Sequence, residues 1–207
     1  MKVNEWLAFF KEHQGKKLFS LSDISGLVDE GKASLSVQLT RLVRSGLVVH
    51  PVRGWYENPF QPPTKEETAM VIRYPSYLSM EYALSYRGVL SQNVFTFTLV
   101  TRKLPYTFRS ENCVYEYHQI RKELFWGYRW EGTYLVAESE KALLDLIYLR
   151  AVHSKEMDVD SLGSLVEDME MDELDFIKLY KYAESYDRRT RDILSALEIE
   201  RVELAVR

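Results

Sequence analysis

The sequence predicts an α+β protein that begins with a small helical domain and continues into a larger mixed domain. Three observations indicate this fold class. Amphipathic helical segments fill the first 45 residues, and three prolines within five residues interrupt the chain soon afterwards. Alternation of β-branched or aromatic with polar residues then indicates strands between 94 and 136, and helical periodicity continues from 137 to near the C-terminus.

Two short helices are expected first. The first covers 2–13, with Asn4 as its cap and Gly15 beyond its end. Ser20 is a suitable cap for the second helix, and the turn 29–31 follows it. The apolar residues that would pack this second helix inward are Ile24, Leu27 and Val28.

The stretch from Lys32 to Tyr56 organises the N-terminal domain. Four apolar residues recur at helical spacing and define the buried face of a third helix: Leu35, Leu39, Leu42 and Val43. Gly46 suits the position after a helix end, where the backbone often turns left-handed. A short strand over 47–51 and a tight turn into a second strand over 52–56 are expected next. Helix, helix, helix and hairpin is the order of a winged helix-turn-helix, which binds DNA.

The exposed face of the third helix carries the expected DNA contacts, because such helices usually lie in the major groove. Arg41 is suited to guanine, Gln38 to adenine, and Ser34 to a phosphate or a base. Arg44 and Lys32 are expected to contact phosphates, which adds affinity but little sequence information. The full predicted set is Lys32, Ser34, Val37, Gln38, Thr40, Arg41, Arg44 and Arg53. The alternative is an ordinary solvated face on a small helical domain.

Charge is distributed unevenly along the chain. Residues 1–65 carry nine Lys or Arg against six Asp or Glu, residues 66–150 carry ten of each, and residues 151–207 carry eight against fifteen. Because the N-terminal domain is only weakly basic, a homodimer on two DNA half-sites is expected to add phosphate contacts. Arg53, at the hairpin tip, is placed to reach the DNA backbone or the minor groove. The acidic end suggests a different partner, or a surface that only keeps the protein soluble.

The prolines between Asn58 and Thr64 favour an extended, stiff connection. The predicted domains are a winged helix-turn-helix over 1–57, a Pro-rich linker over 58–66 and an α+β domain over 67–207. In the last domain a helix is expected to start at Ser79 and stop near Gly88. The expected strands are 94–100, 106–108, 114–118, 125–130 and 133–136. The helices expected after them are 137–149, 158–169, 172–185 and 187–198.

Cysteine content and hydropathy indicate a cytoplasmic protein. The single cysteine, Cys113, leaves no partner for an intrachain disulfide and none for a cysteine-rich zinc site. The N-terminus lacks the apolar core of a signal peptide, and no apolar run approaches the roughly 18 residues of a membrane span. We therefore expect no membrane association.

Three segments resemble the AbiEi family of antitoxin-like transcriptional regulators. They are Arg53-Gly-Trp-Tyr56 after the helical head, Tyr77-Leu-Ser-Met-Glu-Tyr-Ala-Leu84, and Val136-Ala-Glu-Ser-Glu-Lys-Ala-Leu-Leu-Asp145. In the third segment Glu140, Lys141 and Asp145 match the family pattern, whereas Ser139 stands where a proline is usual. The resemblance covers about residues 18–150, and the third segment is its most specific part.

The resemblance implies the antitoxin of a type IV toxin–antitoxin system. Such proteins bind inverted repeats in their own promoter and repress it. Their second domain counters a cognate nucleotidyltransferase-like toxin, and the family is associated with abortive infection, a form of phage defence. A stand-alone relative without a toxin is equally compatible with the sequence.

The residues of the second domain do not predict an enzyme, a cofactor or a metal. A nuclease would need Glu-x-Lys on a strand, but Ser139 lies two residues before Lys141. Glu138, Glu140, Lys141 and Asp145 are instead spaced for ion pairs at a helix start. A protein-interaction module remains an alternative function, and a nuclease-like enzyme a lesser one. Basic and aromatic residues interleaved from 102 to 130 suit either a second nucleic-acid surface or an aromatic core with basic edges.

Overall fold

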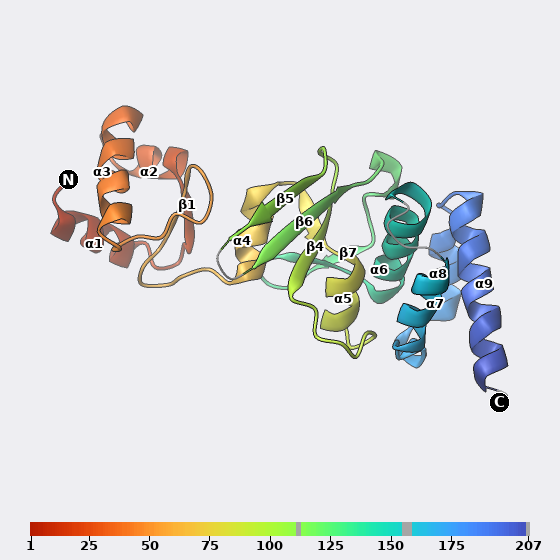
Figure 1. The fold of residues 1–207 in the computed structure, drawn as a ribbon. Coiled ribbons are helices and arrows are strands. Elements are labelled where there is room, and N and C mark those ends of the chain that lie inside the picture. Colours follow the sequence, from red (N-terminus) through yellow and green to blue (C-terminus); the bar gives the residue numbers. More distant parts are fainter. Residues whose placement is uncertain (111–112, 155–158, 206–207) are drawn as a thin grey trace. The chain divides into compact units, whose positions relative to one another are not determined.

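In the computed structural model, which describes residues 1–110, 113–154 and 159–205, the protein is a mixed α+β molecule (Figure 1). The chain divides into two compact units, Met1–Ile72 and Arg73–Arg207. The division falls later than the predicted linker, because a helix that the sequence did not predict, α4 (Lys65–Ile72), belongs to the first unit.

The first unit contains α1 (Val3–Glu12), β1 (Leu18–Ser20), α2 (Leu21–Leu27), α3 (Lys32–Arg44) and β2 (Trp55–Glu57). The two strands pair antiparallel, with Phe19 opposite Tyr56. The predicted strand over 47–51 is wrong, since these residues are irregular and β2 pairs with β1 instead. One hydrogen bond, from Glu57 N–H to the Val49 carbonyl at 2.9 Å, still joins this segment to β2.

Aromatic and aliphatic side chains from every helix of this unit except α4 form one core. Its buried members are Trp6, Phe9, Phe10, Phe19, Ile24, Leu35, Leu39, Leu42, Val48 and Tyr56. Ser20 caps α2 as predicted, because its Oγ accepts from Asp23 N–H at 3.0 Å. The cap of α1 is Lys2 rather than the predicted Asn4. The apolar spacing of α3 is confirmed, with its three leucines buried.

The segment predicted as a linker is attached to the first unit at both ends. Asn58 is fully buried, and its Nδ2 donates to the carbonyls of Phe10, His13 and Lys16 at 2.9–3.2 Å. Further along, Glu67 of α4 accepts from Lys17 Nζ at 2.8 Å. The prolines therefore lie in a stretch that is fixed to the helical unit by buried polar contacts.

The second unit contains a six-stranded sheet of order β5-β6-β4-β3-β8-β7. The strands are β3 (Ser76–Leu78), β4 (Thr96–Thr101), β5 (Tyr106–Arg109), β6 (Val114–Gln119), β7 (Tyr128–Trp130) and β8 (Leu135–Ala137). β3 runs parallel to β8, β4 runs parallel to β6, and the other pairs are antiparallel. The predicted strands are confirmed with shifted bounds, and β3 is an additional one.

Helices pack against this sheet and form the C-terminal part. They are α5 (Met80–Tyr86), the 3-10 turn η1 (Lys122–Leu124), α6 (Ser139–Leu146), the π-helical η2 (Ile147–Ser154), α7 (Val159–Glu167), the 3-10 turn η3 (Met171–Glu173), α8 (Phe176–Ala183) and α9 (Arg188–Ala205). The predicted helix over 137–149 thus continues as a π-helix after Leu146. The predicted start of the next helix, residue 158, lies outside the described residues.

Candidate functional site

Seven of the eight predicted DNA-contacting residues are exposed, and they lie on α3 and on the loop before β2. Val37, for example, keeps 53% of its surface exposed although it is apolar. The other exposed members are Lys32, Ser34, Thr40, Arg41, Arg44 and Arg53. Gln38 is half-buried. The predicted face is therefore solvent-facing over most of its length, which is the first requirement for contact with a nucleic acid.

A groove of about 560 Å³ lies between the C-terminal half of α3 and the 50–54 loop. It brings together three of the predicted residues, Thr40, Arg44 and Arg53, from two different elements. Its other lining residues are Leu21, Ser36, Val43, His50, Gly54 and Tyr56. Ser36 and His50 were not predicted as site residues. Ser36 lies near the edge of the predicted helical face, but nothing in the local sequence ties His50 to α3.

In the N-terminal half of α3, polar side chains form hydrogen bonds with Glu30, which precedes the helix. The Gln38 amide donates to Glu30, while Ser34 Oγ donates to Glu30 Oε2 at 3.1 Å. Gln38 Oε1 also accepts from Trp6 Nε1 at 3.1 Å and from the Met1 amino group at 2.6 Å. Hydrogen bonds from that amino group, Gln38 and Ser34 lower the pKa of Glu30. The predicted contact of Gln38 with adenine is therefore unsupported, because both ends of its amide are already bonded within the protein.

We expect Gln38→Ala to change DNA affinity by less than about twofold while lowering the free energy of unfolding by about 1–2 kcal/mol, because it leaves partly buried groups without partners. Fluorescence anisotropy with DNA and urea unfolding measure the two effects. A tenfold loss of affinity with unchanged stability would instead assign Gln38 to base recognition.

Two of the three residues that match the family pattern, Lys141 and Asp145, form a buried charge cluster. Lys141 and Asp145 are both fully buried and pair with each other one turn apart on α6. Asp145 Oδ2 accepts from Tyr77 Oη at 2.9 Å and from Ser79 Oγ at 2.8 Å, and Asp145 Oδ1 accepts from Tyr186 Oη at 2.8 Å. Lys141 Nζ also donates to Tyr77 Oη at 2.9 Å. Both charges are thus surrounded by partners, as buried charges require.

The surroundings of Lys141 are aromatic. Its ammonium lies 5.4–5.5 Å from the ring centroids of Tyr77, Trp126 and Tyr186. Burial lowers the pKa of Lys141, against the opposing effect of Asp145, and burial followed by the Asp145 charge raises the pKa of Tyr186 well above its usual value. Gly127 packs on the lysine stem so closely that an added Cβ would lie 2.9 Å from Lys141 Cγ. The cluster therefore stabilises the packing of α6 against the sheet and against the segment that follows α8.

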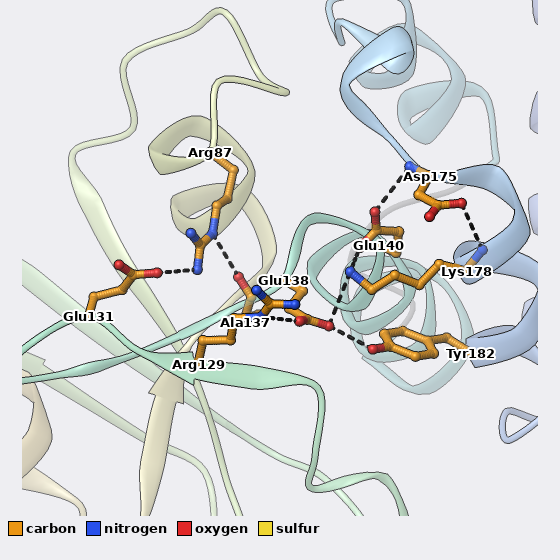
Figure 2. A network of polar contacts seen from close by, with 9 residues as sticks. All are labelled: Arg87, Arg129, Glu131, Ala137, Glu138, Glu140, Asp175, Lys178 and Tyr182. Carbon is orange, nitrogen blue, oxygen red and sulfur yellow. Dashed lines mark hydrogen bonds and ion pairs between the residues drawn. The ribbon is translucent and has the colours of Figure 1, made fainter.

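Glu138 and Glu140, at the start of α6, join a second, outer network (Figure 2). Glu138 pairs with Arg129 and with Lys178 Nζ at 3.2 Å, and it accepts from Tyr182 Oη at 2.6 Å. The spacing of three between Glu138 and Lys141 also suits an ion pair, but Lys141 is fully buried and pairs with Asp145 instead. Burial alone would raise the pKa of Glu138, but hydrogen bonds from Tyr182, Arg129 and Lys178 lower it.

Glu140 completes the link to the helical end of the chain. It pairs with Lys178 Nζ at 2.8 Å and accepts from Asp175 N–H at 3.0 Å, so that α6 is joined to α8. A small cavity of about 180 Å³ lies among Arg87, Arg129, Glu138, Ser139, Glu140 and Lys178. The two carboxylates pair with Arg129 and Lys178. The third cation, Arg87, pairs with Glu131 at 2.7 Å, so the arrangement is that of a structural junction.

In the described ranges 1–110, 113–154 and 159–205, no three His, Cys, Asp or Glu side chains are grouped to hold a metal ion. Within the same residues, no helix has the length and apolar character needed to cross a membrane. Comparison with models of known protein families and with curated proteins found no match.

Proposed function

We propose that the protein is a DNA-binding transcriptional regulator and that α3 of its first unit lies in the major groove. The order of elements in this unit supports a winged helix-turn-helix: β1, between the first two helices, pairs with β2, which follows the loop after α3. In this arrangement the 50–54 loop is the wing. The target in this proposal is double-stranded promoter DNA, and two copies of the chain bind the two half-sites of an inverted repeat.

One observation supports this proposal above the others. The groove beside α3 gathers Arg44 and Arg53 on the exposed side of the helix, while its leucines are buried on the other side. Two arginines from separate elements provide the spaced positive charge that a phosphate backbone requires. Thr40 and Arg41 are exposed next to them, where base edges would lie.

The second unit, in this proposal, acts as an antitoxin against a nucleotidyltransferase-like toxin. The resemblance to AbiEi regulators supports it, because two of the resembling segments, around Tyr77 and Asp145, meet in the buried charge cluster. Co-expression with a nucleotidyltransferase encoded next to its gene tests the idea: the protein must restore growth. A growth arrest that the full chain leaves unchanged contradicts it.

Binding to the DNA upstream of the protein's own gene tests the main proposal. Arg41→Ala is expected to weaken binding to this DNA about tenfold, and to weaken binding to a shuffled sequence much less, because an arginine–guanine contact is worth about 1–3 kcal/mol of base discrimination. Lys11→Ala is the matched control, since Lys11 is an exposed cation of α1. If both DNAs bind Arg41→Ala as tightly as the wild type, the assignment of the recognition helix fails.

A further inference from the structure

His50 holds the tip of the wing by a side-chain hydrogen bond. Its Nε2 accepts from the backbone N–H of Gly54 at 3.0 Å, across a turn that includes Arg53. The imidazole ring also contacts the Tyr56 ring of β2, with 5.1 Å between centroids. His50 therefore connects the two ends of the loop that carries Arg53.

Gly54 is held on its other side as well. Its carbonyl accepts from Leu21 N–H at 3.0 Å, at the first residue of α2. Gly54 has a φ of +83°, a conformation that other residues adopt only with strain. Trp55 N–H, next in the chain, donates to the Val52 carbonyl at 2.9 Å. In the turn 52–55, Arg53 is exposed, whereas Val52, Gly54 and Trp55 are half-buried.

We propose that His50 is a positioning residue for DNA binding: by accepting the Gly54 N–H bond it fixes the wing so that Arg53 and Arg44 reach one phosphate strand lying in the groove. The proposal rests on the DNA-binding function above and specifies how the groove contributes to it. The ligand of the groove is the phosphate backbone, because its lining contains two cations and the Ser36 hydroxyl, whereas Thr40 Oγ1 already donates to the Ser36 carbonyl at 2.7 Å.

The bond requires a neutral imidazole, since only an unprotonated Nε2 accepts. Although His50 is exposed, partial desolvation of its ring lowers its pKa, which favours this neutral form. The charged or titratable groups that line the groove with it are Arg44 from α3, Arg53 from the loop and Tyr56 from β2. Protonation of His50 would remove the acceptor and place a third positive charge beside the two arginines. In this proposal the release of the wing outweighs the attraction of that added charge for phosphate, so DNA affinity is expected to fall as the pH drops through the pKa of His50.

Two variants distinguish the contribution of the His50 hydrogen-bond acceptor from that of its aromatic ring. His50→Phe retains an aromatic ring against Tyr56 but cannot accept, and His50→Gln supplies an acceptor oxygen near the position of Nε2. We expect DNA affinity at pH 7.5 to fall about fivefold in His50→Phe and to stay within about twofold in His50→Gln, as the loss of one hydrogen bond implies. Thermal unfolding of both variants verifies that they are folded.

The pH profile gives a readout that a purely structural role would not move. Between about pH 7.5 and pH 5.5 the wild type is expected to lose affinity, whereas His50→Gln, which does not titrate in this range, follows a flatter profile. Two results would overturn the proposal: wild-type affinity that rises on acidification beyond that of His50→Gln, which would make His50 a direct phosphate contact, or a folded His50→Phe that binds like the wild type. If the wild type binds no DNA at any pH, the proposed function itself fails.

Discussion

Asp145→Ala is expected to lower the free energy of unfolding by about 3–5 kcal/mol, the largest effect of any single substitution considered. The substitution leaves the Lys141 ammonium fully buried without its counter-ion and removes the acceptor of three hydroxyl groups. Since a small domain is stable by only about 5–15 kcal/mol, much of the margin of the second unit would be lost. Urea unfolding measures the change.

Lys141→Met provides the comparison within the cluster. Asp145 would keep its hydroxyl donors from Tyr77, Ser79 and Tyr186, so the loss is expected to be smaller than for Asp145→Ala. Lys178→Ala is the control, because it removes a lysine of the partly exposed outer network. A loss below about 1 kcal/mol for Asp145→Ala would mean that the cluster contributes little to stability.

Helix α3 could be predicted from sequence because its apolar residues recur at helical spacing. Its buried face is therefore determined by residues within the helix itself. Strand β1 could not, since a run of only three residues shows no alternation. The linker was predicted because prolines favour an extended backbone. Its attachment to the first unit could not be predicted, because Asn58 bonds to α1 and the loop after it, more than 40 positions earlier in the chain.

The candidate sites show the same division between local and distant information. The Lys141–Asp145 pair was predictable from its spacing of four on a helix, and the structure confirms it. Tyr186 completes the cluster from 41 residues away, and no local pattern marks it. Gln38 lies on the polar side of α3 as expected, but helical periodicity cannot show that Glu30 and Trp6 occupy its amide.

Removing both arginines of the groove is expected to change the salt dependence of DNA binding. In Arg44→Ala/Arg53→Ala, affinity should fall on the order of 10- to 100-fold at low salt for specific and shuffled DNA alike, because phosphate contacts carry little sequence information. Arg188→Ala/Arg189→Ala is the matched control, since it removes the same charge from exposed residues of α9.

The slope of the logarithm of affinity against the logarithm of salt concentration, measured for these two double variants and the wild type, tests most directly whether the first unit binds DNA through α3 and the wing. We predict that the slope of Arg44→Ala/Arg53→Ala is smaller than that of the wild type by about two, roughly one for each lost phosphate contact, while the α9 variant keeps the wild-type slope. Equal slopes for all three proteins, or a reduced slope in the α9 variant alone, would contradict this interface.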